Sequence, residues 1–529
     1  MNNTEYNIEH IEENISEELK KLRKLNSNIS GRRSTDYFSS RETRQHFLQK
    51  VIVANRGEIA KRFFLALHEE GIPSVAVVTD VDRGQSWYEF ADEVVFIGEA
   101  ENYSNIYTII AAVFLVKANA VYAGYGFLSE NVEFVETLNL VSEHFEHEII
   151  FMGPDHTTMK LVGDKESARR LAKQNDIPLF EGSELLTKND LEKTRHEAKR
   201  IGYPIIIKLS AGGGGKGMYP VYSEDELETS LEASIRIGED LYNNSNYYIE
   251  KYIENPVHIE VQIFNGWSIG IRKCAVQRRK QKIIEESGSA FLDVYLSLSL
   301  LATAEKIAHI SGYKNGCGAG TVEFLIDNDT NKVGFMEMNT RLQVEYAVTD
   351  QSLGIDLAKW QIVNFDQGEH AITAKEVLPN RLHVHEHAIE CRIYAEDPEN
   401  DYLPSPGKII EMDLPTFNGI RCDFGFSEGD SILPMYDPLI GKIIANGSTR
   451  EETVIRMERA LQELYIKGVK TNIKQLIKVV RHEIFREGSY SNNFLEDNNH
   501  LIDEKDTFIV DRRKVKHIIF GAIAEHIYY

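Results

Sequence analysis

The sequence predicts a multidomain protein with a parallel α/β region followed by α+β regions. Three observations support this. Buried-strand runs alternate with helical patterns up to about residue 160, longer strands joined by a polar turn follow, and a third strand-rich region begins near Arg381. Alternating strands and helices are typical of a parallel sheet, whereas two strands joined by a short polar turn pair antiparallel. With 529 residues, the chain is long enough for two to four domains.

Composition shifts divide the chain into a polar extension, three folded regions and a tail, which we place at 1–47, 48–160, 161–375, 380–498 and 499–529. The formal net charge of −23 argues against a nucleic-acid or anionic-membrane surface. The four cysteines are scattered without C-x-x-C spacing, which favours a reduced, cytoplasmic setting. The longest apolar run, at 109–116, is too short to span a bilayer.

The extension contains one amphipathic helical pattern. Its apolar residues have helical spacing, and lysines and arginine follow the glutamates, which is a favourable charge order: Ile11, Ile15, Leu19, Leu22, Lys20, Lys21, Arg23 and Lys24. The first 20 residues carry six glutamates, unlike secretory signals and transit peptides. The favoured interpretation is a helix that packs on its own domain or frays in solvent, and the alternative is a docking helix for a partner subunit.

The first folded region opens with the strand run VIVAN at 51–55, followed by a helical pattern that ends at Gly71. Further strand runs lie at 74–79, 91–98 and 119–126. A Rossmann-like parallel sheet is therefore expected. No G-x-G-x-x-G follows the first strand, so a dinucleotide site there is poorly supported.

The second region contains the glycine run KLSAGGGGKGM at 208–218. It is not a Walker A loop, because Ser210 replaces the first glycine of that motif and Gly217 its Ser/Thr. Glycines lack a Cβ, so their N–H groups can approach polyphosphate closely, as expected for Gly213, Gly214 and Gly215. A merely tight turn would need one or two glycines. The run therefore predicts a lid that closes over a nucleotide.

Two later strands carry carboxylates. Glu323 lies in TVEFL, and Glu337 and Asn339 lie in FMEMN. Side chains alternate along a strand, so Glu337, Asn339 and Arg341 can share one face, and Glu323 can meet Glu337 across the hairpin. Two carboxylates and an amide oxygen suit Mg²⁺, and Mn²⁺ would also fit. Apolar flanking residues argue against the alternative of a solvated polar face.

A strand lysine, a glycine lid and a Glu…Glu-x-Asn hairpin together resemble ATP-grasp ligases. Seven further strings, in order, look like the biotin carboxylase component of biotin-dependent acyl-CoA or pyruvate carboxylases: ANRGEIA (54–60), GYGFLSEN (124–131), GDKESA (163–168), QRRKQK (277–282), EMNTRLQVE (337–345), ECRIYAEDP (390–398) and LPSPGKI (403–409). The resemblance runs from about Val51 to Glu496. It implies an ATP-grasp fold at 161–375 with its lid at about 180–252, preceded by a Rossmann-like domain and followed by a biotin carboxylase C-terminal domain.

The resemblance also implies roles for individual residues. The positions that match ATP contacts are Lys165, Lys208, the lid glycines, Glu250, Lys251, Ile253, His258, Gln277 and Leu325. The magnesium ligands match Glu323, Glu337 and Asn339. The bicarbonate pocket matches Lys282, Arg341, Gln343 and Val344, and the biotin contacts match Tyr125, Gly126 and Arg392.

Four of these positions match catalytic residues: Lys282, Arg341, Glu345 and Arg392. Glu345 matches the general base that deprotonates bicarbonate, and Arg341, four residues away, could be the cation that keeps it charged. Arg392 matches the residue that stabilises the enolate form of biotin.

The implied activity is MgATP-dependent carboxylation of biotin with bicarbonate, through carboxyphosphate. The biotin would sit on a separate carrier protein, because the only Met-Lys, Met159-Lys160, matches a structural helix of the family rather than a biotin attachment site. The resemblance further implies a carboxyltransferase subunit as partner and a homodimer. The final acceptor, an acyl-CoA or pyruvate, would be chosen by another polypeptide.

Two other functions remain open: another ATP-grasp carboxylate ligase, and a catalytically silent homologue that regulates a carboxylase. A metal site on the alternating histidines His383, His385 and His387 is a further, less favoured possibility. The chain departs from the usual family pattern at Tyr122, Ala123, Ala211, Lys280, Tyr346, Ala347 and Asp350, and has SNNFLED at 491–497 where the family has an apolar residue near the adenine. These changes bear on kinetic constants and inhibitor fit, whereas the matched reactive positions are all present.

Overall fold

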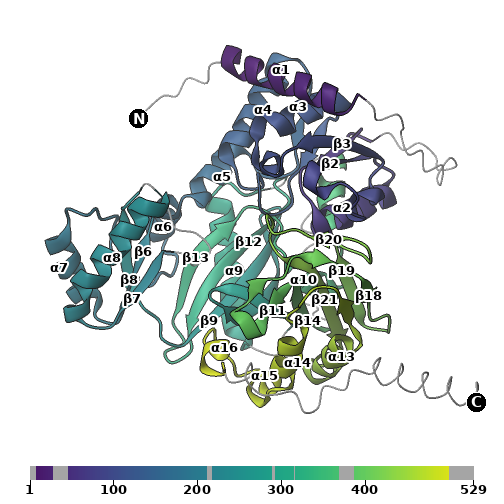
Figure 1. Cartoon of the computed structure of the whole chain (residues 1–529). Coiled ribbons are helices and arrows are strands. Elements are labelled where there is room, and N and C mark those ends of the chain that lie inside the picture. The colour runs from purple at the N-terminus through teal and green to yellow at the C-terminus, as the bar shows by residue number, and fades with distance from the viewer. Residues whose placement is uncertain are drawn as a thin grey trace, which may run out of the picture.

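The computed structural model describes residues 8–27, 46–210, 217–242, 244–288, 292–314, 316–367 and 386–499, apart from the side chains of Lys165 and Tyr242. Figure 1 shows an N-terminal layer at the top, a large twisted sheet below it, and a smaller unit with α7 and α8 that projects to the left. Among the described helices, none is both long and apolar enough to cross a membrane.

The N-terminal layer is a parallel sheet, as predicted. Its strands have the order β3-β2-β1-β4-β5 and the bounds Val51–Val53 (β1), Ser74–Thr79 (β2), Glu93–Gly98 (β3), Ala120–Tyr122 (β4) and Ile150–Phe151 (β5). The helices of this layer are α2 (Gly57–Glu70), α3 (Ile106–Val116), α4 (Val132–His144) and α5 (His156–Gly163). Gly71 ends α2 in the left-handed region with φ 77°, a conformation that glycine adopts without steric cost.

The amphipathic helix of the extension is α1 (Ile8–Leu25), and it packs on α3 and β3 of its own domain (Figure 1). Its apolar side chains Ile11, Ile15 and Leu22 are buried. Thr108 of α3 donates a hydrogen bond of 2.9 Å to Glu18. The first of the two alternatives for this helix, packing on its own domain, is therefore confirmed.

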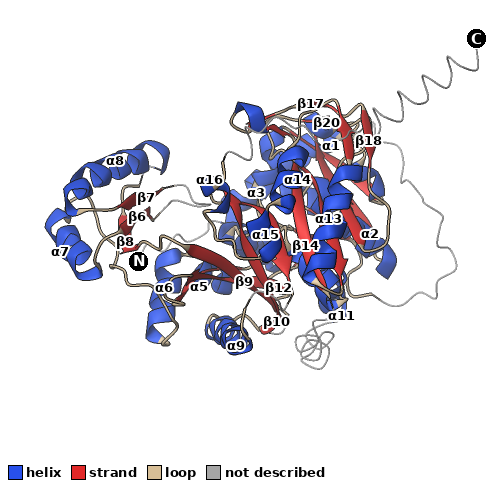
Figure 2. Cartoon of the chain, turned by 90° about the horizontal axis from the view of Figure 1, so that it is seen from below, coloured by secondary structure: helices blue, strands red, loops and turns tan. Residues whose placement is uncertain are grey.

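The projecting unit is built on a three-stranded antiparallel sheet of order β7-β6-β8, with bounds Ile205–Leu209 (β6), Met218–Val221 (β7) and Tyr247–Lys251 (β8). Helices α7 (Leu191–Ile201) and α8 (Glu224–Tyr242) belong to it, and α6 (Lys165–Gln174) precedes it. Both views place this unit away from the body (Figures 1 and 2). The glycines Gly213, Gly214 and Gly215, which connect β6 and β7, lie outside the described residues.

The central element is an eight-stranded antiparallel sheet of order β13-β12-β9-β10-β11-β14-β21-β19. Its strands are β9 (Pro256–Phe264), β10 (Trp267–Arg278), β11 (Gln281–Ser287), β12 (Ala319–Asp327), β13 (Val333–Asn339), β14 (His387–Tyr394), β19 (Ile420–Phe424) and β21 (Leu439–Gly447). The predicted hairpin of β12 and β13 is confirmed. The second and third sequence regions thus share one continuous sheet, joined where β11 pairs with β14.

Helices cover this sheet: α9 (Val294–Ile310), α10 (Tyr346–Leu353), α11 (Leu357–Gln367), α13 (Arg450–Glu463), α14 (Ile473–Arg481), α15 (Glu483–Glu487) and α16 (Phe494–Asp497). Short strands complete the C-terminal region: β15 (Glu396–Asp397) with β16 (Leu403–Pro404), β17 (Gly407–Lys408) with β20 (Ser431–Ile432), and β18 (Glu411–Asp413) with β22 (Tyr465–Lys467). The largest apolar core lies between the sheet and the helices α9, α13, α14 and α15.

Candidate active site

The hairpin of β12 and β13 brings the predicted metal ligands together. Glu323 and Glu337 are directly opposite each other in register, and Asn339 follows Glu337 on the same face of β13. Glu323 accepts hydrogen bonds from Asn339 at 2.8 Å and from Gln343 at 2.7 Å. Two carboxylates and a side-chain amide in one place form a donor set of hard oxygens, which fits Mg²⁺.

Lys282 of β11 is the cation at the centre of the site. Its Nζ donates to Glu345 at 2.8 Å and to Glu323 at 3.2 Å, and it forms an ion pair with Glu260. Burial alone would lower the pKa of Lys282, but Glu260, Glu323 and Glu345 outweigh it and raise that pKa well above its usual value. These carboxylates therefore favour the charged form of the lysine.

Glu345 immediately precedes α10 and is only 2% exposed. One of its carboxylate oxygens accepts from Lys282, and the other accepts from the Nη2 of Arg392 at 2.9 Å. Burial would raise the pKa of Glu345, but the charges of Lys282 and Arg392 lower it overall. The carboxylate is thus ionised and able to accept a proton.

Arg341, the expected cation beside Glu345, interacts with the charge of Glu345, but its ion pair is with another carboxylate. Arg341 forms an ion pair of 2.9 Å with Glu130 of the N-terminal layer, and its Nη2 donates to Asn339 at 3.3 Å. It leaves β13 toward that layer, so its guanidinium is drawn to Glu130. The cations that contact Glu345 are Lys282 and Arg392.

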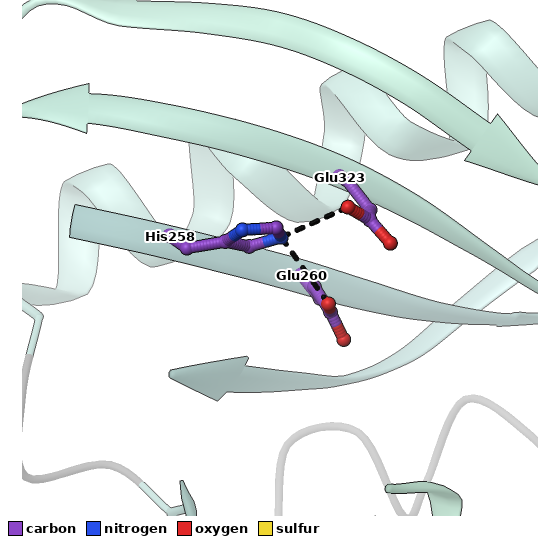
Figure 3. Close-up of side chains that lie close together, drawn as sticks. All are labelled: His258, Glu260 and Glu323. Atoms are coloured by element: carbon purple, nitrogen blue, oxygen red, sulfur yellow. Dashed lines mark ion pairs between the residues drawn. The ribbon is translucent and has the colours of Figure 1, made fainter. Parts of the chain in front are cut away.

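His258 of β9 lies between two carboxylates in Figure 3. Its Nε2 is 3.0 Å from Glu323 and 3.2 Å from Glu260, and its Nδ1 is 3.1 Å from the amide nitrogen of Gln277. Burial would lower the pKa of His258, but Glu323 and Glu260 together raise it to about 9. Leu325 is directly opposite His258 on β12, so these expected nucleotide contacts lie along one edge of the site.

The lid sheet carries the other expected nucleotide contacts. Lys208 of β6 and Arg169 of α6 both form ion pairs with the buried Glu250 of β8. Lys251 instead donates to two backbone carbonyls of its own unit, Gly202 and Tyr203, each at 3.0 Å. Ile253 is buried. Lys165 begins α6, and its side chain lies outside the described part of the chain.

The expected biotin contacts approach from the N-terminal layer. The Tyr125 hydroxyl donates to Glu58, and Gly126 has φ 72° with open space where a Cβ would be. Lys442 of β21 lies 3.4 Å from the same Glu58 carboxylate, and it donates to the backbone carbonyl of Val344. This chain of contacts connects the Tyr125 loop to the residue that precedes Glu345.

Sequence reasoning missed several charged residues of the site. Glu260 and Arg272 are completely buried, and Arg272 donates to Glu260 at 3.1 Å and to Gln343 at 2.8 Å. The Arg272 bond orients Gln343, whose own amide then donates to Glu323. The signal available was the alternation of His258, Glu260 and Gln262 along a strand, which places all three on one face.

The departures from the family pattern fall in two places. Tyr122 is buried and stacks on Phe63 with ring centroids 3.5 Å apart, and the Tyr346 ring lies 4.4 Å from the Lys442 Nζ. Lys280 lies in the β10–β11 turn with φ 69°. Of the alternating histidines, His387 donates a hydrogen bond of 2.8 Å from Nε2 to the Glu286 carboxylate, while His383 and His385 lie outside the described residues.

Known proteins resemble this chain over most of its length. Three family models match consecutive parts of the chain: biotin carboxylase, N-terminal domain, at 47–159; carbamoyl-phosphate synthase L chain, ATP binding domain, at 164–369; and biotin carboxylase C-terminal domain at 390–497. A biotin carboxylase of Haemophilus influenzae is 40% identical over 464 residues, which cover 85% of this chain and 98% of that protein. The chain belongs to the biotin carboxylase family.

Solved structures of biotin carboxylases have the same fold. The biotin carboxylase–β-γ-ATP complex from Campylobacter jejuni matches with a TM-score of 0.78 and 36% identity over 85% of this chain and 99% of that one. The biotin carboxylase domain dimer of Hydrogenobacter thermophilus 2-oxoglutarate carboxylase, with MgADP and bicarbonate, matches with a TM-score of 0.80 and 36% identity over 88% of this chain and 100% of that one. The predicted family and fold class are confirmed.

Proposed function

We propose that this chain is a biotin carboxylase, which uses MgATP and bicarbonate to carboxylate biotin on a separate carrier protein. The observation that carries the proposal is Glu345, whose two carboxylate oxygens are held by Lys282 at 2.8 Å and Arg392 at 2.9 Å, beside the Glu323–Glu337 pair. A charged carboxylate within reach of two cations can remove a proton from a small anion that those cations attract.

The residues divide the work as follows. Lys282 and Arg341, with the Gln343 amide and the Val344 backbone, would hold bicarbonate, and Glu345 would take its proton. Glu323, Glu337 and Asn339 would hold Mg²⁺, which supplies charge neutralisation at the phosphates of ATP. Lys208, now paired with Glu250, would turn to the phosphates when the lid closes and excludes water. Arg392 would stabilise negative charge on the biotin ureido oxygen.

The proposed domain division matches this division of work. The N-terminal domain at 48–160 would offer Tyr125 and Gly126 to biotin, the ATP-grasp domain at 161–375 with its lid at about 180–252 would bind the nucleotide, and the C-terminal domain at 380–498 would supply Arg392. Members of the family work within biotin-dependent carboxylases. The partners we propose are a biotin carboxyl carrier protein, a carboxyltransferase subunit and a second copy of this chain, in the cytoplasm, where the four free thiols would stay reduced.

Two measurements test the proposal. The purified protein should release ADP from MgATP only when bicarbonate is present, and free biotin should take up label from ¹⁴C-bicarbonate. Arg392→Ala should lower biotin carboxylation at least about tenfold while bicarbonate-dependent ATP cleavage falls less, because Lys282 still holds Glu345. If the rate of bicarbonate-dependent ATP cleavage does not change when free biotin is added, another ATP-grasp ligase is favoured instead. If the protein cleaves no ATP although it binds tightly to a carboxylase assembly, a silent homologue is favoured.

A further inference from the structure

Two buried carboxylates face each other at the seam between the ATP-binding and C-terminal regions. Glu285 of β11 and Glu390 of β14 are directly opposite in register, and both are completely buried. Directly opposed residues of an antiparallel pair lie on the same face, with Cβ atoms about 4.5–5.5 Å apart. Arg392 lies two residues beyond Glu390 and therefore shares this face.

Arg392 is bound by two carboxylates on different elements. Its Nε donates to Glu285 at 2.6 Å, its Nη2 lies 2.5 Å from the same Glu285 oxygen, and that Nη2 also donates to Glu345 at 2.9 Å. With only 8% of its surface exposed, the guanidinium is bridged between Glu285 and Glu345. Glu285 makes the closer contact, and through two guanidinium nitrogens.

Glu390 is equally buried but does not bind the Arg392 guanidinium as Glu285 does. Among the described residues, neither of its carboxylate oxygens has a hydrogen-bond partner. Burial raises the pKa of Glu390 well above its usual value despite the charges of Lys442 and Arg392. Lys442 itself is occupied by Glu58 and by the carbonyl of Val344. Burial also raises the pKa of Glu285, against the opposing charge of Arg392, so contacts distinguish the two carboxyl groups. Glu285 pairs with the arginine, whereas Glu390 makes no hydrogen bond within the described part of the chain.

We propose that Glu285 is a positioning residue that keeps Arg392 in place at the moment when Glu345 releases it. The inference rests on the proposed function, in which Glu345 accepts a proton. A protonated Glu345 loses the charge that attracts the Arg392 guanidinium, and this happens just before the step that needs Arg392 near biotin. Glu285 is not the proton acceptor of that reaction, and it contacts the Nε and Nη2 of Arg392 directly rather than through Glu345, so it can hold the guanidinium through both steps.

The test separates the two half-reactions in Glu285→Gln, an isosteric change that removes the charge. We expect biotin carboxylation to fall by about tenfold or more, and bicarbonate-dependent ATP cleavage without biotin to change by less than about threefold. Glu390→Gln is the matched control, because Glu390 lies directly opposite, is equally buried and makes no hydrogen bond to Arg392 among the described residues. It should retain both activities. Glu285→Asp, which keeps the charge but is one methylene shorter, should give an intermediate loss in the biotin step.

Three results would overturn the inference: an equal loss of both activities in Glu285→Gln, no loss in either, or a loss in Glu390→Gln as large as that in Glu285→Gln. A crystal structure of Glu285→Gln gives a readout that needs no activity. We expect the Arg392 guanidinium to move away from its place beside strand β11, and an unmoved guanidinium contradicts the positioning role. If the wild-type protein carboxylates no biotin at all, the proposed function is wrong, while this structure still decides whether Glu285 positions Arg392.

Discussion

The two faces of the eight-stranded sheet differ in what their buried charges contact, and β11 shows both faces in adjacent residues. Glu285 and Glu286 are both completely buried. Glu285 points to the α10 side and binds Arg392. Glu286 points to the side of the C-terminal helices, where it contacts His387 and Arg450, each at 2.8 Å, and accepts from the Tyr490 hydroxyl.

This difference shows that burial alone does not distinguish a reactive charge from a structural one. The Glu286 cluster connects β11, β14, α13 and the loop before α16, and none of its members lies in the proposed site. The charges on the α10 side form a connected series from Glu260 through Lys282, Glu345 and Arg392 to Glu285. A buried charge costs desolvation energy on either face, and only the identity of its partners separates a role in catalysis from a role in stability.

The largest effect that we expect is on the α10 side. Glu345→Gln should lower bicarbonate-dependent ATP cleavage by about 10²–10⁴-fold, or about 3–5 kcal/mol of activation free energy, because the general base is removed. Nucleotide affinity, measured by calorimetry, should survive. Lost nucleotide binding would mean that Glu345 supports the ATP site rather than the proton transfer. Glu286→Gln serves as control, and its folded fraction should cleave ATP normally.

On the opposite face the same kind of change should act on stability. Glu286→Gln should lower the free energy of unfolding by about 3 kcal/mol, because Arg450 is left buried without its carboxylate. Chemical denaturation monitored by fluorescence measures this change. The comparison between the two faces fails if Glu286→Gln is as stable as the wild type, or if it loses activity while fully folded.

The pH dependence of stability should sharpen the contrast. Burial would raise the pKa of Glu286, but the hydrogen bond from His387 and the charge of Arg450 hold it well below its usual value of 4.5. The unfolded state then binds the additional proton below about pH 4.5, so the stabilising contribution is present above that pH and is lost on acidification. As the pH falls below about 4.5, the free energy of unfolding of the wild type should decrease more steeply than that of Glu286→Gln, by up to about 1.4 kcal/mol per pH unit. Free energies of unfolding that fall in parallel with pH in the two proteins would contradict the low pKa of Glu286.

The smallest expected effect is that of Tyr490→Phe. It removes one hydroxyl donor to Glu286 but keeps the stacking of the ring on Phe485, with centroids 5.3 Å apart. The loss should be about 1 kcal/mol in the free energy of unfolding, with both half-reactions unchanged. A drop in activity without a drop in stability would place this cluster in the site.

Much of the fold could be predicted because apolar periodicity was intact. The strand run at 74–79 matches β2, and Gly71 ends α2 as expected. By contrast, the sequence did not predict strands β10 and β11, because charged residues interrupt their apolar pattern: Arg272, Lys273, Glu285 and Glu286. Those charges are buried because they pair with residues on other strands, which local sequence does not reveal.

The candidate site was predictable where its residues are close in sequence. Strand alternation and a short turn were enough to place Glu323 opposite Glu337. The partner of Arg341 was not predictable, because Glu130 lies in another layer of the fold. The hydrogen bond from Arg392 to Glu345 was likewise not predictable, because it depends on β14 joining the same sheet as β11. The resemblance to a family indicated the expected role of each residue, whereas the side chains that each residue contacts are seen only in the three-dimensional structure.

The packing of α1 on α3 has a consequence for synthesis of the protein. α1 leaves the ribosome before α3, so the surface that buries Ile11, Ile15 and Leu22 is incomplete until α3 ends at Val116. The intervening stretch of roughly 90 residues takes about 5–20 s to translate, at about 5–20 residues per second. During that time the apolar stripe of α1 lacks the α3 surface that covers it in the folded protein, so α1 can complete its packing only after α3 has been made.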